Sequence, residues 1–220
     1  MTLDKNPEKI HTMFNLISEK YDFINDVMSF GTQKFIKSCC IKNLDIKSGD
    51  SVLDLCCGTG DLAGMIKNRG ANVTGIDFSE KMLDIAKDRF SDICWLQGDV
   101  TNLPFPDESF DYVVMGFGLR NIRNAEKAIE ETYRVLKPNG KFMHIDFGEK
   151  NFLSSIYDKV TPLLVKFFTE NSFAYSYLIQ SKREFLSPDE LIKDFESKGF
   201  KFQKRKDYLF SVISCQIMKK

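Results

Sequence analysis

Hydrophobic and polar positions follow two periods through residues 49–149, where short apolar runs of strand length alternate with stretches of helical spacing. The predicted strands are Ser51–Leu55, Asn72–Asp77, Ile93–Gln97, Phe110–Met115 and Lys141–Asp146. The predicted helices are Asp61–Arg69, Glu80–Phe90 and Ala125–Leu136, of which the last ends at the Lys137–Gly140 turn. Ser79 and Asn124 are suited to cap the second and third of these helices. Such alternation predicts a parallel sheet with helices on both faces.

The two ends of the chain carry different patterns. Residues 1–48 predict helices over Glu8–Tyr21 and Thr32–Leu44, joined by a polar turn over 22–31. Residues 150–187 contain the apolar helical segment Phe152–Phe168, and residues 188–220 predict the helix Asp189–Lys198 and the strands Lys201–Asp207 and Leu209–Met218. Because very few residues separate these two strands, they must pair antiparallel.

These patterns predict one α/β domain. Its parts are an N-terminal helical cap (1–48), a cofactor-binding core (49–149), a helical cap insertion (150–187) and a C-terminal helix with a β-hairpin (188–220). A doubly wound sheet that is mostly parallel and ends in an antiparallel hairpin is typical of the Rossmann-like fold of class I methyltransferases. Dinucleotide-binding domains do not usually have this strand arrangement.

Composition and charge narrow the possible partners. Lys plus Arg equals Asp plus Glu at 31 each, so net charge gives no reason to expect nucleic acid as a partner. The chain has neither a run of about 18 apolar residues nor an apolar signal core near its start, which favours a cytoplasmic location. None of the six cysteines forms a CxxC unit, and the two histidines are isolated, so we expect reduced thiols and no metal site.

Candidate chemistry begins at the turn after the first predicted strand. Gly58-Thr59-Gly60 permits a tight backbone there, and with Ala63 it also fits the dinucleotide pattern GxGxxA. Asp54 precedes the glycines, where a carboxylate can meet the amino-acid end of S-adenosylmethionine directly or through water. A dinucleotide instead needs this corner clear for its pyrophosphate. A nicotinamide-dependent oxidoreductase therefore remains the alternative from another enzyme class.

Three further strand ends carry suitable residues. Asp77 is placed to bind both ribose hydroxyls, although it could instead cap the next helix. Asp99 can bind the adenine amine beside the Val100 backbone, or it is an ordinary turn residue, and Gly116 allows close approach under the methyl donor. The predicted cofactor-binding residues are Asp54, Gly58, Thr59, Gly60, Asp77, Phe78, Asp99, Val100 and Gly116.

Four segments of the chain resemble signatures of the ubiquinone/menaquinone-biosynthesis C-methyltransferases: Val52–Leu62, Tyr21–Gly31, Gly116–Asn121 and Arg134–Pro138. The resemblance runs from about residue 8 to residue 220. It implies transfer of a methyl group from S-adenosylmethionine to a ring carbon of a prenylated quinol, for example demethylmenaquinol. It also implies cofactor contacts from the residues matching the family pattern, which are Thr59, Asp77, Asp99, Val100 and Gly116.

Departures from the family pattern lie in the predicted substrate cap. Ile24, Gln33 and Ile36 stand where the family usually has Met, His and Trp, and the sequence Leu186-Ser187-Pro188 lacks a His before the Pro. Naphthoquinol and benzoquinol acceptors therefore both remain open. Another small phenol or lipid is the alternative acceptor, and a binding module without catalysis is the alternative outside enzymes.

Arg120 and Asn121 are the candidate catalytic residues, just past the fourth strand. An arginine cannot act as a base, but it could stabilise a phenolate oxygen or hold a water, and Asn121 could orient the same ring. An ion pair with a neighbouring helix is the structural alternative for Arg120. The candidate substrate-binding residues are Tyr21, Asp22, Asn25 and Phe117. For the first three, a capped turn is the alternative interpretation.

Two features of the sequence each allow more than one interpretation. His144 lies inside a predicted strand, as a buried hydrogen-bonded residue or as a general base. The Phe152–Phe168 helix could cover the sheet, line a tunnel for a prenyl tail or form a mouth that faces a membrane. Peripheral membrane contact and a homodimer are both compatible with the sequence, which specifies no interface.

Overall fold

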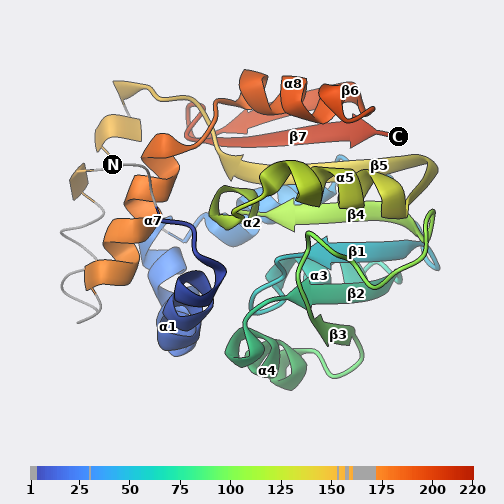
Figure 1. Ribbon diagram of the computed structural model, residues 1–220, viewed down its shortest axis with the longest axis horizontal. Helices are drawn as coiled ribbons and strands as arrows, with labels where there is room; N and C mark the ends of the chain where they lie inside the picture. Colours follow the sequence, from blue (N-terminus) through green and yellow to red (C-terminus); the bar gives the residue numbers. More distant parts are fainter. Residues whose placement is uncertain (1–3, 30, 153, 157–158, 161–171) are drawn as a thin grey trace.

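A seven-stranded sheet forms the centre of the molecule (Figure 1). This computed structural model describes residues 4–29, 31–152, 154–156, 159–160 and 172–220. The strand order is β3-β2-β1-β4-β5-β7-β6, and all neighbouring strands are parallel except the two pairs that involve β7. The strands are β1 (Ser51–Leu55), β2 (Asn72–Asp77), β3 (Cys94–Gln97), β4 (Phe110–Gly116), β5 (Leu136–Phe147), β6 (Lys201–Tyr208) and β7 (Ile213–Lys219). The predicted fold class, with one antiparallel strand near the C-terminus, is confirmed.

Helices cover both faces of the sheet, with α5 and α8 in front and α2 and α3 behind in Figure 1. Side chains of β4 alternate between two hydrophobic clusters. Val113 and Met115 pack in the cluster that contains α5 and α8, whereas Val114 packs with α2 and α3. Burial on both faces explains the continuous apolar run of this strand. These helices are α2 (Gln33–Ile41), α3 (Asp61–Lys67), α5 (Ala125–Val135) and α8 (Pro188–Ser197).

A helical cap lies beyond the carboxyl ends of the parallel strands, on the left in Figure 1. It contains α1 (Pro7–Met28) and α7 (Ser172–Glu184), which pack on α4 (Glu80–Arg89) through the cluster Met13, Ile17, Met82, Tyr177 and Leu178. The Ser79 hydroxyl, which caps α4, also donates to Asn15 of α1 at 2.5 Å. None of the helices within the described ranges is long and apolar enough to cross a membrane.

The N-terminal helix differs from its prediction, because α1 continues to Met28 through the segment predicted as a turn. Asp and Asn in that segment favour turns locally. In the folded protein, however, the Asp22 carboxylate accepts hydrogen bonds from Thr59 and Arg89. Tertiary contacts of this kind override weak helix propensity.

Three boundaries in the second half also differ from the prediction. β5 begins at Leu136, so the predicted Lys137–Gly140 turn lies inside an irregular strand whose register to β4 shifts between Phe110 and Tyr112. β7 begins at Ile213, because residues 209–212 form a turn. Within the predicted 152–168 helix the described positions 152, 154–156 and 159–160 are helical, and 161–168 lie outside the described residues.

Candidate active site

Two adjoining cavities lie between the carboxyl ends of the strands and the cap. Cavity A has a volume of about 410 Å³ and cavity B about 320 Å³. Both are lined by Tyr21 of α1 and by a shared strip of core residues, which is Cys56, Gly58, Gly116 and Phe117. Cys56 and Phe117, the first residues after β1 and β4, have φ angles of 53° and 60°. Strained backbone of this kind is concentrated at functional sites.

Asp54 lies in the wall of cavity A, and only one of its two carboxylate oxygens is hydrogen-bonded within the described part of the chain. Its Oδ2 accepts a hydrogen bond from the Ala63 N–H at 3.0 Å, and its buried Oδ1 has no partner within the described part of the chain. Burial raises the pKa of this carboxyl to about 8, partly opposed by the Ala63 hydrogen bond and the nearby Lys37 charge. The site therefore holds a buried acid that a cation would return to its ionised form.

Asp77 ends β2 in the wall of cavity B. Its Oδ2 accepts from the Gly58 N–H at 2.8 Å and its Oδ1 from the Ser79 N–H at 2.9 Å. Burial raises the pKa of the carboxyl, while these two backbone donors lower it. The cap of α4 is Ser79 and not Asp77, because the Met82 N–H donates to the Ser79 hydroxyl. Each Asp77 oxygen keeps a further acceptor site for a ligand.

The other predicted cofactor residues fall into two groups. Phe78, Asp99 and Val100 line cavity B, and the exposed Asp99 also accepts a hydrogen bond from the Thr101 N–H at 2.8 Å, so it is a turn residue as well. Gly60 lines neither cavity. It takes a φ of 84° at the start of α3, and a Cβ there would lie 2.6 Å from the Trp95 ring, so its role in the structure is to shape the turn.

Charged residues fasten the cap to the glycine turn. The Asp22 carboxylate of α1 accepts from the Thr59 hydroxyl and from Arg89 of α4, each at 2.7 Å. Arg89 also donates to the Thr59 carbonyl at 3.0 Å and to Asp61 at 2.6 Å, and Lys37 of α2 binds the second Asp61 oxygen at 3.2 Å. Three helices are thus tied to one turn. Asp22 lines cavity A, and both of its oxygens take part in this network.

Arg120 forms a buried ion pair in the wall of cavity A. It follows β4 in the short helix η1 (Leu119–Asn121) and is 5% exposed. One guanidinium nitrogen donates to Asp146 at 2.7 Å and to the Phe117 carbonyl at 2.9 Å, and the group lies over the Phe147 ring at 5.0 Å. The partner comes from the neighbouring strand β5 and not from a helix. The Nε of Arg120 has no hydrogen-bond partner among the described residues.

The remaining predicted site residues are divided between the cavities. Asn25 lines cavity A, whereas Asn121 lines cavity B, so Arg120 and Asn121 do not face the same space. Asn121 donates to the Phe117 carbonyl at 3.3 Å, and its buried Oδ1 is unpaired within the described ranges. Burial raises the pKa of the Tyr21 hydroxyl, although the Arg120 charge opposes that shift.

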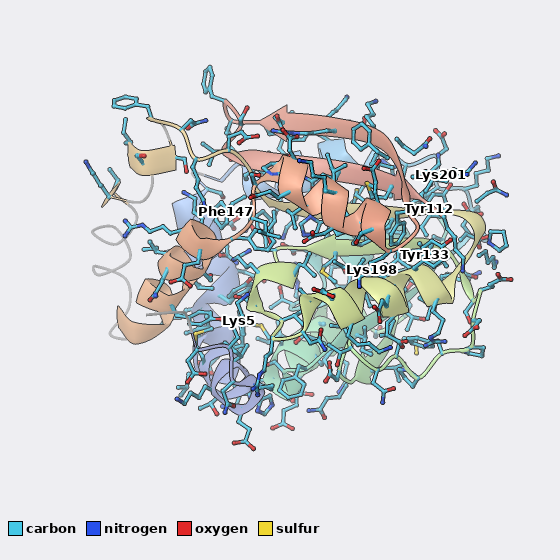
Figure 2. All side chains as sticks on the ribbon, turned by 45° about the horizontal axis from the view of Figure 1, so that its top comes forward. Lys5, Tyr112, Tyr133, Phe147, Lys198 and Lys201 are labelled. Atoms are coloured by element: carbon cyan, nitrogen blue, oxygen red, sulfur yellow. The ribbon has the colours of Figure 1, made fainter. Side chains whose placement is uncertain are left out.

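Part of the lining of cavity A is apolar, and we call this part the apolar arm. Side chains from β5, α7 and the start of β7 line this arm, with further residues from the segments that precede them; they are Phe147, Ile156, Val160, Leu178, Ile179, Leu209, Phe210, Val212 and Ile213. Figure 2 shows Phe147 beside α7 at the cap end of the sheet, whereas Tyr112 and Lys201 lie at the opposite end. A cavity that has both polar groups and an apolar arm in its wall suits a ligand with one polar end and one apolar end.

His144 lies outside both cavities. Its ring is fully buried among Phe142, Phe185 and Phe195, and its Nδ1 lies 2.9 Å from Gln216 Oε1. Burial lowers the pKa of the ring. This placement supports the buried structural interpretation over a general base.

Several residues of the site went unpredicted, among them Asp146 and Arg89. A signal existed for Asp146, since it is the last residue of the predicted strand Lys141–Asp146 and the carboxyl ends of parallel strands are where ligands bind. Arg89 gave no comparable signal, because it is one charged residue among several on α4. Its contacts with Asp22 and Asp61 depend on how α1 and α3 meet α4.

Comparison with known proteins decides the family. The model of the ubiE/COQ5 methyltransferase family matches residues 2–220. A demethylmenaquinone methyltransferase of Staphylococcus haemolyticus is 36% identical over 96% of this chain and 93% of its own length. One of the same name from Lactobacillus johnsonii is 39% identical over 90% of this chain and 87% of its own. The chain belongs to the ubiE/COQ5 methyltransferase family.

Membership in the ubiE/COQ5 family confirms the predicted enzyme class and methyl donor. The protein is a methyltransferase that uses S-adenosylmethionine, and the oxidoreductase alternative is excluded. Among solved structures, a Thermotoga maritima S-adenosylmethionine-dependent methyltransferase superposes with a TM-score of 0.72 at 23% identity, over 95% of this chain and 99% of its own. At that identity the similarity shows the shared fold.

Proposed function

We propose that this ubiE/COQ5 family member methylates a ring carbon of a prenylated quinol, as the name of its demethylmenaquinone methyltransferase relatives suggests. The observation that carries the proposal is the lining of cavity A. It combines polar and charged groups, Arg120 among them, with the apolar arm, as a molecule with a quinol ring and a prenyl tail requires. Such a molecule partitions into bilayers, so the reaction also calls for peripheral contact with a membrane.

The donor fits the residues of both cavities. We assign Asp77 to the ribose hydroxyls, and Asp99 with the Val100 backbone to the adenine, since all three line cavity B. Asn121 lines the same cavity, and its Oδ1, unpaired within the described ranges, is a further candidate acceptor for the adenosine part. The unpaired Asp54 Oδ1 in cavity A would accept from the ammonium of the methionine end.

S-adenosylmethionine, when bound, supplies an electrophilic methyl carbon on a sulfonium. The remaining task of the protein is to position a ring carbon and to make it nucleophilic. A quinol carbon becomes a good nucleophile when the neighbouring hydroxyl ionises, and a nearby cation lowers the pKa of that hydroxyl. Arg120 is a cation in the wall of cavity A that also binds the Phe117 carbonyl at the end of β4, so we assign it to the phenolate oxygen.

Purified protein incubated with methyl-labelled S-adenosylmethionine and demethylated naphtho- and benzoquinols tests this function. We expect the label on a ring carbon and not on oxygen. The same ring without a prenyl tail should react with a higher KM, because the apolar arm of cavity A remains unfilled. Label on oxygen, or turnover of simple phenols with no advantage for prenylated quinols, would replace this proposal by the alternative of another phenolic acceptor.

Cofactor affinity is expected to depend on the protonation of Asp54. The pKa of Asp54 is about 8 in the ligand-free protein, so the carboxyl is mostly neutral at pH 6.5. A bound ammonium lowers that pKa, so binding below pH 8 releases a proton and affinity rises as the pH approaches 8, by at most about tenfold per pH unit. Calorimetric titration with S-adenosylhomocysteine at pH 6.5, in two buffers of different ionisation enthalpy, measures the released proton.

Asp54→Asn is the matched control for this titration. It preserves the side-chain shape and an acceptor for the Ala63 N–H, but it cannot ionise. The variant should bind more weakly above pH 8 and should release no proton at pH 6.5. Equal proton release from the wild type and from Asp54→Asn would assign the ionisation to another group.

A further inference from the structure

The turn between β6 and β7 has an unusual backbone. Three consecutive residues, none of them glycine, adopt left-handed conformations, with φ angles of 50° for Leu209, 55° for Phe210 and 67° for Ser211. Side chains rarely adopt this region, because it brings Cβ close to the backbone. Packing and hydrogen bonds elsewhere must therefore hold the turn in this shape.

The segment that follows β5 supplies those hydrogen bonds. The Glu149 N–H donates to the Ser211 carbonyl and the Gly148 N–H to the Val212 carbonyl, both at 2.8 Å. A Cβ on Gly148 would collide with the Ser211 carbonyl oxygen, so this close approach requires glycine. The Asn151 side chain then donates to the Phe210 carbonyl at 2.8 Å. The turn is thus a built feature and not a loose loop.

This construction leaves large apolar side chains exposed on two segments that the Asn151 hydrogen bond brings together. Phe210 is 83% exposed, and Phe152, next to the Asn151 that binds it, is 78% exposed. Leu209, Ile156 and Val160 are exposed as well. We call these five residues the mouth ridge. Large groups of exposed apolar residues are rare on monomeric proteins, and they usually mark an interaction site.

The mouth ridge is continuous with the apolar arm of cavity A. All of its members except Phe152 line that cavity while remaining exposed to solvent. A long apolar molecule lying in the mouth ridge could therefore slide into the cavity without crossing water. A protein partner seated there, including a second copy of this chain, would instead close the entrance.

We propose that the mouth ridge inserts into a lipid bilayer and that the enzyme takes its acceptor from there. The inference rests on the proposed function, since it assumes a lipid acceptor. Arg205 of β6 is held by three carboxylates, Glu149, Asp189 and Asp207, at 2.7 to 2.9 Å, so it offers no free positive charge to an anionic lipid headgroup. Docking is therefore driven by apolar insertion, and a bilayer of neutral phosphatidylcholine suffices.

Sedimentation with phosphatidylcholine vesicles tests the docking. Wild-type protein should bind, and raised salt should not release it. Phe152→Ser and Phe210→Ser should each lower the partition coefficient about tenfold, because each removes a side chain that the bilayer would bury. Phe202→Ser is the matched control, since Phe202 is also exposed (41%) but lies near the far end of β6, next to the Lys201 seen in Figure 2. It should bind as the wild type does.

A second readout separates docking from catalysis. With a short-tailed quinol in buffer without vesicles, Phe152→Ser should keep wild-type kcat/KM, because Phe152 lies outside cavity A. Failure of the wild type to bind vesicles while it methylates the quinol would overturn the docking and leave the proposed function intact. Vesicle binding without any quinol methylation would instead refute the proposed function. A wild-type dimer that Phe210→Ser dissociates, with no vesicle binding, would assign the mouth ridge to a second copy of the chain.

Discussion

Asp77→Ala is expected to weaken S-adenosylhomocysteine binding by at least about 100-fold, because hydrogen bonds to a charged group contribute about 1.5–3 kcal/mol each and two ribose bonds are lost. The substitution also removes the acceptor for the Gly58 and Ser79 N–H groups, which hold the glycine turn against β2. Both effects act on the same ligand. Calorimetric titration of the purified variant measures the change in Kd.

Asp84→Ala is the control for this experiment, since Asp84 lies on α4 as an exposed residue whose partner is Lys87. It should bind S-adenosylhomocysteine as the wild type does. Thermal melting of Asp77→Ala reports whether the turn has lost its structure. A folded Asp77→Ala variant with wild-type Kd would remove Asp77 from the ribose site and would move the donor out of cavity B.

The central sheet could be predicted from the sequence because its signals are local. Strands such as β1 and β4 are largely apolar, β1 is followed within three residues by Gly58, and β4 ends in Gly116. The rule that ligands bind at the carboxyl ends of parallel strands then placed Asp54, Asp77 and Asp99 in the walls of adjoining cavities. The sequence alone was enough to place these three residues together, since a parallel sheet brings the carboxyl ends of its strands to one edge.

Interactions between distant segments could not be predicted in the same way. The α1 helix passes through Asp22 because Thr59 and Arg89 bind that carboxylate, and local propensity alone favoured a turn. The left-handed residues 209–211 contain no glycine or asparagine that would indicate such a turn. Their conformation depends on contacts with residues 148–151, which follow β5.

Arg120 shows both limits within one residue. From its position after β4 we predicted that Arg120 lies beside the acceptor, and the structure places it in the wall of cavity A. Its partner depends on the pairing of β4 with β5, which brings Asp146 within 2.7 Å. Asp146 is 1% exposed, so Arg120 is its counterion as well as a candidate for chemistry. Any test of Arg120 must therefore separate these two roles.

Arg120→Ala alone would leave the Asp146 charge buried and unpaired, which typically destabilises a protein by about 3–5 kcal/mol. The double variant Arg120→Ala/Asp146→Asn removes both charges and keeps an acceptor for the Phe147 N–H, which now donates to Asp146. We expect this variant to bind S-adenosylhomocysteine with wild-type Kd. Its kcat should fall about 100- to 1000-fold, the usual effect of removing one group that stabilises a developing oxyanion.

The pH dependence of the remaining activity distinguishes chemistry from structure. If Arg120 stabilises the phenolate, the double variant must wait for the acceptor hydroxyl to ionise unaided, near the pKa of about 10 of a free phenol. Its rate should then rise with pH over a range in which the wild type has already reached its plateau. Asp146→Asn with Arg120 intact should keep the wild-type pH profile, since the guanidinium stays charged. A double variant with wild-type kcat, or with lower kcat and an unchanged pH profile, would leave Arg120 a structural partner of Asp146.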